Sequence, residues 1–401
     1  MAELTVIVAA RDEEERIGAT VTALRQQFPD AEVIVADDGS RDRTAPEAED
    51  AGARVVCLPR RGKGQALTLA ERAAGPGALL LCDADLTGDL RALLASAADL
   101  AVAAFTEQQG GGFGIAKGTA RRLLRLATGR DLREPLSGQR ALSPAAREAC
   151  FPTAAGFGCE VGMTLDTVRA GLTVEEVELP LRHRATARDL RGFTHRARQL
   201  RDVLLAFGPQ ATNHRGLRLP LVGWIVGALV PQVAAVAAIG LADDLFSGPE
   251  RGVPAHLRAG RTTGVLKLAG IPLAGLFATR KLSGALLVAL AANTLNQLDT
   301  KPGRALKAYT LAALPLRAPL LPAVMLAPYD LREMAMLGDS GSNALGAVLG
   351  LSSVERFTVR GRWLAIGALA GLNLLGELTS LGDAIERTPV LRDLDAAGRR
   401  A

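Results

Sequence analysis

Residues Val33–Thr44 read VIVADDGSRDRT, an apolar β-type run that ends in two aspartates and a turn containing glycine. A similar run at Leu81–Leu86, LCDADL, ends in Asp83 and Asp85. Apolar runs that alternate with helical patterns are typical of an α/β protein with a parallel sheet. In such a sheet ligands bind beyond the carboxyl ends of the strands, so both acidic turns are candidate binding positions.

The sequence around these turns supplies the rest of the sheet. Strands are expected at residues 4–9, 33–36, 54–58 and 78–82. Ile17, Val21, Leu24 and Phe28 share one face of an expected helix, because their spacing follows the helical period. Further helices are expected near residues 45–51 and 65–74. The sequence therefore predicts an α/β domain over residues 1–212.

The acidic turns have the composition of a nucleotide and metal site. Asp83 and Asp85 alternate along an extended chain, so both side chains can point to the same side. Mg²⁺ prefers one or two carboxylates together with phosphate oxygens. Asp37 and Asp38 alone fit an ordinary turn, but two acidic turns at successive strand ends favour a binding site. Between them, the Gly-Lys-Gly sequence around Lys63 precedes a helix start, where a lysine and backbone N–H groups can hold phosphate.

The composition differs between the two halves of the chain. Hydrophobic residues make up 48% and charged residues 22% of the 401 residues, and the charges are concentrated in the first half. The net charge of +5 suits a protein that lies against anionic lipid. The 3% aromatic content argues against nucleic-acid binding. The first residues lack the pattern of a signal peptide, so we expect the first domain to be cytoplasmic.

Residues 4–205 resemble a family 2 glycosyltransferase with the nucleotide-sugar-binding GT-A fold, and most closely the subgroup of dolichyl-phosphate mannose synthases. The segments that carry the resemblance are Val6–Ile17 (VIVAARDEEERI), Val33–Thr44, Gly62–Leu67 (GKGQAL), Leu81–Leu86, Ser137–Leu142 (SGQRAL) and Gly156–Leu165 (GFGCEVGMTL). The resemblance implies a UDP- or GDP-linked sugar donor, with Asp38 and Asp37 on the nucleoside. It also implies Mg²⁺ or Mn²⁺ on the donor diphosphate, held by Asp85 and supported by Asp83.

Further residues are candidates for the acceptor side and the donor side. Glu160 and Asp131 are candidates to line the acceptor site and join Asp85 as the candidate catalytic set. Glu160 is equally compatible with an ordinary helix face. A phosphate acceptor is already ionised and needs no strong base to attack the sugar. Gln139 and Arg140 match the Ser-Gly-Gln-Arg segment of the family and are expected to reach the donor phosphates.

Two basic stretches, residues 117–130 and 188–207, are amphipathic, with arginines on one face and apolar side chains on the other. Such helices can lie in a membrane interface. A solvated helix face is an equally good interpretation of the first stretch. It is a poorer one for the second, which runs into an apolar segment.

Residues 213–385 have the composition of an all-α polytopic membrane domain. Residues 216–241 hold one charge, Arg218, over a length that exceeds the roughly 20 residues needed to span a bilayer. Shorter apolar stretches follow at 265–278, 282–292, 305–327, 344–351 and 363–375. We expect five to seven membrane segments, a multi-pass location in the cell (inner) membrane, and a cytoplasmic tail at residues 386–401.

The second half resembles the polyprenyl-phosphate N-acetylhexosamine-1-phosphate transferases. The matching segments are Asn213–Gly216 (NHRG), Gly240–Phe246 (GLADDLF), His256–Lys267 (HLRAGRTTGVLK), Asn293–Asp299 (NTLNQLD) and Leu337–Gly346 (LGDSGSNALG). The resemblance implies a magnesium site on the cytoplasmic face, with contributions from Asp243, Asp244, Asn293, Asn296, Asp299 and Asp339. The family's first membrane helix and its histidine-rich loop are absent from this sequence.

Topology adds a constraint on the second half. Asn213 and Asp243 must face the same side if both sites are cytoplasmic, whereas a single span in residues 216–241 would separate them. We therefore expect two short helices that break near Pro231. The same reasoning predicts a second hairpin in residues 305–327, with its turn marked by Arg317 and by Pro315 or Pro319.

The sequence favours a membrane-bound glycosyltransferase that moves a sugar from a nucleotide-diphosphate donor to a polyprenyl-phosphate or lipid-linked acceptor in envelope glycoconjugate synthesis. One alternative is a bifunctional enzyme whose membrane domain also transfers sugar-1-phosphate to polyprenyl phosphate. Another is a membrane domain that serves only as a platform. A transporter or scaffold is a third class, but it leaves the strand-end carboxylates without a role.

Overall fold

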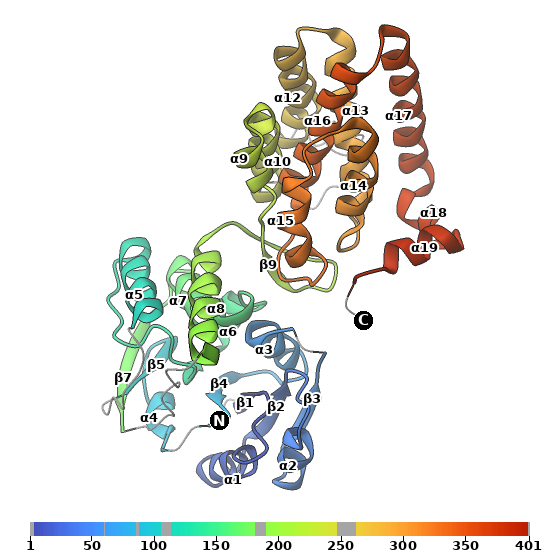
Figure 1. Cartoon of the computed structure of the whole chain (residues 1–401). Coiled ribbons are helices and arrows are strands. Elements are labelled where there is room, and N and C mark those ends of the chain that lie inside the picture. The colour runs from blue at the N-terminus through green and yellow to red at the C-terminus, as the bar shows by residue number, and fades with distance from the viewer. Residues whose placement is uncertain are drawn as a thin grey trace. The chain divides into compact units, whose positions relative to one another are not determined.

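The chain divides into two compact units, Met1–Arg218 and Leu219–Ala401, called here the first and second units. The computed structural model describes residues 4–59, 61–85, 88–105, 114–180, 190–246 and 262–399. Figure 1 shows the first unit as a sheet covered by helices and the second as an assembly of helices.

The first unit is built on a seven-stranded sheet in the order β3-β2-β1-β4-β6-β5-β7. Its strands are β1 (Leu4–Ala10), β2 (Glu32–Asp37), β3 (Arg54–Cys57), β4 (Ala78–Asp83), β5 (Leu100–Phe105), β6 (Arg140–Leu142) and β7 (Val174–Leu179). The four strands expected from the sequence are confirmed. The sheet is mixed rather than wholly parallel, because β6 runs antiparallel to both β4 and β5.

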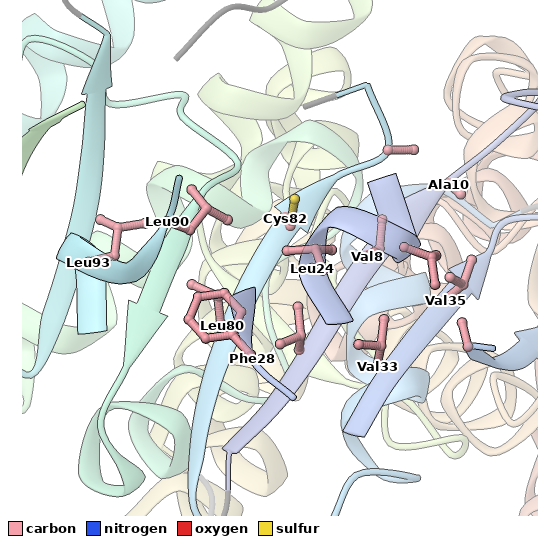
Figure 2. Packing of buried hydrophobic residues seen from close by; sticks show 14 of the residues in the cluster. Val8, Ala10, Leu24, Phe28, Val33, Val35, Leu80, Cys82, Leu90 and Leu93 are labelled. Carbon is pink, nitrogen blue, oxygen red and sulfur yellow. The ribbon is translucent and has the colours of Figure 1, made fainter. Parts of the chain in front are cut away.

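Helices cover both faces of this sheet. One face carries α1 (Ile17–Gln27), α2 (Thr44–Asp50) and α4 (Arg91–Leu94), and the other carries α3 (Lys63–Glu71), α6 (Pro144–Cys150) and α7 (Cys159–Arg169). Successive side chains of a strand point to opposite faces. In β2, Val33 and Val35 therefore join the core beneath α1, as Figure 2 shows, whereas Ile34 joins the core beneath α3.

Two amphipathic helices pack beside α7. They are α5 (Ile115–Thr128) and α8 (Leu190–Phe207), and they correspond to the two basic stretches of the sequence. Leu124 of α5 and Val203 of α8 are buried against Val161 and Leu165 of α7. The helical prediction is thus confirmed for both stretches within the described residues, and each helix buries an apolar face inside the first unit.

The connection between the units begins with β8 (Gln210–Thr212) and β9 (Arg218–Pro220), which form a two-stranded sheet. The boundary between the compact units follows Arg218 and lies beyond the predicted boundary at residue 212. The turn at 213–216, which the sequence analysis grouped with the second half, belongs to the first unit. Arg72, at the end of α3, donates to the carbonyl oxygens of Arg215 at 3.0 Å and Gly216 at 2.6 Å.

The second unit is helical throughout its described part. Its helices are α9 (Ile225–Leu229), η2 (Pro231–Val233), α10 (Ala234–Phe246), α12 (Thr262–Thr279), α13 (Leu282–Leu298), α14 (Arg304–Leu316), α15 (Leu321–Asp330), α16 (Gly338–Arg356), α17 (Val359–Thr379), α18 (Leu381–Arg387) and α19 (Pro389–Ala396). Most of α16 is buried. A Cβ atom on Gly346 or Gly350 would lie within 2.6 Å of the backbone of α13, so glycine is what lets these two helices approach closely.

Both predicted helix breaks are present. The first falls at Val230–Pro231, between α9 and the short η2 turn that leads into α10. The second falls between α14 and α15, where Arg317 ends α14 with a φ of 50° in the left-handed region. Pro231 and Arg317 therefore mark the two breaks, whereas Pro315 lies inside α14.

The helices of the second unit are short relative to a bilayer. Among the described residues, no single helix combines the length and the apolar composition that crossing a membrane requires. Within the same described ranges, α17 together with α18 meets both criteria, and that pair bends by 84°.

The predicted tail at residues 386–401 is in large part a folded element of the second unit. Its helix α19 carries Asp395, which is buried. This carboxylate pairs with the guanidinium of Arg304 in the first turn of α14, at 2.8 Å between Oδ2 and Nη2. Since Arg304 is only 3% exposed, it needs a buried acid nearby, and α19 supplies it.

Candidate active site

The strand-end carboxylates of the first unit gather at one edge of the sheet. In the parallel register, Ala10 of β1 lies opposite Asp37 at the end of β2, and Ala9 lies opposite Asp83 at the end of β4. The two aspartates thus flank the end of the same central strand. This confirms the prediction that both acidic turns open onto the carboxyl edge.

A cluster of three charged side chains forms beside Asp83. The ammonium of Lys63, the first residue of α3, lies 2.6 Å from Oδ1 of Asp83 and 2.7 Å from Oε1 of Glu160. Glu160 is in the first turn of α7 and is only 5% exposed. Gln139 donates to Oδ2 of Asp83 at 3.2 Å. Four of the predicted site residues, from four separate segments, therefore meet at this edge.

The electrostatics of the cluster keep Lys63 charged. Burial alone would lower the pKa of this amine, but the carboxylates of Asp83 and Glu160 outweigh it, and the pKa lies well above its ordinary value. A charged ammonium in a partly dehydrated site attracts anions more strongly than one in water. The cluster therefore presents one ammonium together with two carboxylates, both signs of charge at the same edge of the sheet.

Asp38 and Asp37 organise the loops around the cluster. Oδ1 of Asp38 accepts hydrogen bonds from the backbone N–H groups of Arg61 at 2.6 Å and Gly62 at 2.9 Å. This fixes the start of α3, where Gly62 has a φ of 108° that favours glycine. Asp37 accepts from both the N–H and the hydroxyl of Ser40. Of the N–H groups predicted to hold phosphate, that of Gly62 thus binds Asp38 instead. Nucleoside contact by the two aspartates stays a prediction.

Asp85 lies two residues beyond the end of β4 and is half-buried. The carbonyl of Ala84 accepts a hydrogen bond from Thr20 of α1 at 2.7 Å, which holds this part of the chain in place. Asp83 and Asp85 offer the hard oxygen ligands that Mg²⁺ or Mn²⁺ prefers. Within the described residues no group of three or more potential metal ligands forms. A metal ion here would therefore complete its shell with ligand phosphates and water, as Mg²⁺ commonly does.

Two predicted residues lie outside this cluster. Arg140 is fully buried, and its guanidinium donates to the carbonyls of Ser137 and Pro135 and to the hydroxyl of Thr164. The structure thus corrects its expected role on donor phosphates, because the alternation of β6 turns the side chain inward. Asp131 is exposed after α5, and both of its oxygens pair with Arg121. Its role at the acceptor site gains no support from this position.

A second cluster forms in the second unit from motifs that are distant in the sequence. The ammonium of Lys267 on α12 contacts both Asp339 of α16 and Oδ2 of Asp243 on α10, the latter at 3.1 Å. Asn296 of α13 donates to Oδ1 of Asp339 at 2.7 Å. Asp244 accepts the N–H groups of Asp339 at 2.8 Å and of the following serine at 3.0 Å. Four of the six predicted residues therefore converge.

One oxygen of this cluster is without a partner. Oδ1 of Asp243 is buried and has no hydrogen-bond partner among the described residues. A buried carboxylate oxygen of this kind is costly unless something binds it. The cluster thus pairs Lys267 with the carboxylates of Asp243 and Asp339 and leaves one buried oxygen of Asp243 for a ligand.

In the described part of the chain, the remaining predicted residues of the second unit are not seen to contact this cluster. Asp299 directly follows α13, and burial together with the charges of Asp330, Asp339 and Asp244 raises its pKa well above the ordinary value. Asn293 is exposed and donates instead to Asn373 of α17. The first part of the predicted His256–Lys267 motif, residues 256–261, lies outside the described residues.

Several functional positions were not predicted from the sequence. Lys267 lies in one of the matching segments but was not predicted as a site residue, although a lysine within an apolar stretch is itself a signal. Gly138 was also overlooked. A Cβ atom there would lie 2.3 Å from Oδ2 of Asp83, so only glycine allows the carboxylate its position. No local pattern reveals such a contact, because it joins two segments distant in the chain.

The comparisons with known proteins point to the same part of the chain. Residues 5–117 match the family described as Glycosyl transferase family 2. Protein RfbJ of Shigella flexneri is 33% identical over 86 residues, which are 21% of this chain and 67% of that protein. The 4,4'-diaponeurosporenoate glycosyltransferase of Staphylococcus aureus is 49% identical over 53 residues, but this chain spans only 14% of its length.

Solved structures show a further likeness. Glucosyl-3-phosphoglycerate synthase of Mycobacterium tuberculosis, solved with phosphoglyceric acid, is 28% identical over 51% of this chain and 79% of that chain, with a TM-score of 0.44. Another structure of the same enzyme, 26% identical and with the same TM-score, contains Mg²⁺ and UDP. It covers 51% of this chain and 79% of that chain.

Proposed function

The chain belongs to glycosyl transferase family 2 through residues 5–117, and we propose that it moves a sugar from a nucleoside-diphosphate donor to a polyprenyl-phosphate or lipid-linked acceptor. The observation that carries this proposal is the meeting of Asp83, Lys63 and Glu160 at the carboxyl edge of the sheet. That edge is where open α/β sheets bind nucleotides. The charged cluster supplies both signs of charge that a diphosphate and its metal ion require.

The transfer breaks the bond between the anomeric carbon and the donor diphosphate and forms a bond from that carbon to an acceptor oxygen. The nucleoside diphosphate leaves with the electron pair. Lys63 is positioned to offset the negative charge that develops on this leaving group. An acceptor phosphate is already ionised, so Glu160 need not remove a proton and orients Lys63 through its ion pair.

Asp85, supported by Asp83, would hold Mg²⁺ or Mn²⁺ on the donor diphosphate. Such an ion neutralises the diphosphate and makes it a better leaving group. Gln139 orients Asp83 through its hydrogen bond, while Asp38 keeps the start of α3 in place. These residues define the donor side of the proposed site.

The lipid acceptor and a multi-pass location in the cell (inner) membrane, with the first unit on the cytoplasmic side, are part of the proposal. They are supported by the distribution of exposed apolar side chains. In the first unit the large exposed ones within the described part are Ile115, Leu126 and Leu204. The second unit exposes many more, such as Phe277, Leu364 and Leu378, each at 70% or above. Apolar patches of that extent are characteristic of surfaces that meet lipid or another protein.

A second candidate function concerns the second unit. The convergence of Asp243, Asp339 and Asn296 around Lys267, with an orphaned buried oxygen on Asp243, favours a second site for a diphosphate and Mg²⁺. We propose transfer of sugar-1-phosphate to a polyprenyl phosphate as its activity. In that reaction the lipid phosphate attacks the donor diphosphate, and a nucleoside monophosphate leaves. A platform without catalysis is the alternative role of this unit.

The identity of the released nucleotide separates these functions. The full chain is incubated with UDP- and GDP-sugars, Mg²⁺ or Mn²⁺, and polyprenyl phosphate, and the nucleotides are identified by chromatography. Nucleoside diphosphate that disappears with Asp85→Asn supports glycosyl transfer, and Asp89→Asn, an exposed residue paired with Arg91, serves as the control. Nucleoside monophosphate that disappears with Asp339→Asn supports the second activity. Release of neither nucleotide across the panel would contradict both proposals.

A glycine at the donor site provides a further prediction. Gly138→Ala should lower the transfer rate by about 10- to 100-fold, because the new methyl group would displace the carboxylate of Asp83. Initial rates at saturating donor measure the effect. Gly118→Ala in α5 is the control, since a methyl group there meets nothing within 4 Å and alanine favours the helix. Equal rates for the two variants would show that Asp83 does not need its present position.

A further inference from the structure

The short η1 turn (Gly156–Gly158) directly precedes α7 and its buried Glu160. It is confined on two sides. On one side, the N–H of Gly156 donates to Oε1 of Gln65 in α3 at 3.1 Å. On the other side, the N–H of Phe157 donates to Oδ2 of Asp202 in α8 at 3.1 Å. The turn that leads to Glu160 is therefore held between the helix that carries Lys63 and α8.

Glycines make this close arrangement possible. A Cβ atom on Gly158 would lie 2.6 Å from the carbonyl oxygen of Asp202, and one on Gly156 would lie 2.3 Å from its Oδ2. A Cβ on Gly64 would lie 2.0 Å from the carbonyl oxygen of Ala154. Gly156 also has a φ of 58°, which favours glycine. Because the backbones are in direct contact, a shift of α8 cannot be absorbed by side chains alone.

Asp202 is held as firmly as the turn that it contacts. Its side chain is 12% exposed, and its other oxygen, Oδ1, accepts from Nε and Nη2 of Arg201 at 2.9 and 2.7 Å. Phe157 also meets His195 of α8 edge to face, with ring centroids 4.8 Å apart. The neighbouring Val203 is buried against α7. Asp202 is thus a fixed acceptor rather than a mobile surface group.

We propose that Asp202 is a positioning residue for the transfer reaction, which acts through the Phe157 amide to place Glu160 against Lys63. This inference rests on the proposed glycosyl transfer and deepens it. The opposite end of the cluster has an anchor of its own, because Asp38 binds the N–H groups at the start of α3. Loss of Asp202 therefore displaces Glu160 while the pair of Lys63 with Asp83 stays in place.

Kinetics and hydrogen exchange test this role together. Asp202→Ala should lower kcat for transfer to the acceptor by about 10- to 100-fold, because small misplacements of site groups have effects of that size. The dissociation constant for the nucleoside diphosphate should change less than about twofold, since the donor side has its separate anchor. Asp202→Asn retains an oxygen for the Phe157 amide and should recover most of the rate. Arg198→Ala, which removes an exposed side chain from the same helix, should behave like the unmodified chain.

Hydrogen–deuterium exchange of the full chain provides a readout that does not depend on activity. Asp202→Ala should raise the exchange of amides in residues 156–161, with Asp202→Asn close to the unmodified chain. Unchanged exchange in Asp202→Ala would overturn the inference even if the chain is active. A parallel loss of nucleotide affinity and kcat without rescue by asparagine would also overturn it, since that is the signature of general destabilisation. If the unmodified chain transfers no sugar but exchange responds as expected, the proposed function fails while the anchoring role of Asp202 is supported.

Discussion

Lys63→Met is expected to reduce glycosyl transfer by about 100- to 1000-fold, the range found when one preorganised donor is removed from a site of developing charge. The substitution keeps the length and much of the volume of the side chain but removes its charge. Asp83 and Glu160 then face each other without the cation that both contact. Their repulsion moves the carboxylates apart, and the leaving diphosphate also loses the lysine that is proposed to offset its charge.

The same variant should be less stable. Glu160 is almost fully buried, and removal of the ion-pair partner of a buried charge typically costs about 3–5 kcal/mol. Because the second carboxylate, Asp83, is partly exposed, we expect a value near the lower end of that range. The full chain is unfolded in denaturant, and the unfolding is monitored by hydrogen-exchange mass spectrometry. This method reports on peptides of the first unit separately from those of the second.

The pH dependence of this contribution follows from the sign of the shift. The pKa of Lys63 in the folded chain lies above its ordinary value. At any pH below the ordinary lysine pKa, the ion pairs of Lys63 therefore make their full contribution to the stability of the fold. The contribution is lost only as pH rises through the raised pKa. The difference in the free energy of unfolding between Lys63→Met and the unmodified chain should therefore not decline between pH 7 and 9. Lys117→Met, which removes a more exposed lysine paired with Glu134, is the control. An equal loss of stability in both variants would contradict the special role of Lys63.

The sheet of the first unit was predictable where its strands are continuous apolar runs. β1, β2 and β4 are buried on both faces, and such strands stand out in a sequence. β5, β6 and β7 were not predicted from the sequence, although β5 (LAVAAF) is also a continuous apolar run. β6 has only three residues, and β7, VEEVEL, is an edge strand with three glutamates. Both depend on pairing with β5, which no local pattern specifies.

The site was predictable to the extent that topology decides it. Parallel strands bring their carboxyl ends to one edge, so strand order alone predicts that Asp37 and Asp83 lie together. The side-chain contacts were not predictable in the same way. Arg140 lies in a matching motif, yet its burial against Thr164 of α7 depends on a tertiary contact that the motif does not specify. The use of Asp38 as an anchor for the Gly62 amide depends likewise on a contact between distant segments.

The helix breaks of the second unit were predicted from charge and topology rather than from helix propensity. Pro231 lacks the N–H that a continuous helix would use. Arg317 adopts a left-handed conformation at the end of α14. What the sequence did not reveal is that the final residues fold back as α19 to pair with Arg304, because that contact joins the end of the chain to the middle of the unit.

The ion pair between Asp395 and Arg304 leads to the second prediction with a large expected effect. Asp395→Ala should destabilise the second unit by about 3–5 kcal/mol, because it leaves the buried guanidinium of Arg304 without its bidentate partner. The melting temperature should fall by about 10 °C for a unit of this size. Glu386 also contacts Arg304, at 3.2 Å, but it is far more exposed and cannot replace a buried acid.

Tryptophan fluorescence gives a direct measurement, because both tryptophans of the chain, Trp224 and Trp363, belong to the second unit. Arg392→Ala, which removes an exposed pair with Asp393, is the matched control and should change stability by no more than about 1 kcal/mol. Replacing Asp395 by leucine together with Arg304→Met should recover much of the loss, since neither charge then remains buried alone. A melting temperature for Asp395→Ala equal to that of the control would show that α19 does not stabilise the unit through this pair. Recovery in the double variant would instead identify the unpaired guanidinium, rather than lost packing of α19, as the cause of the instability.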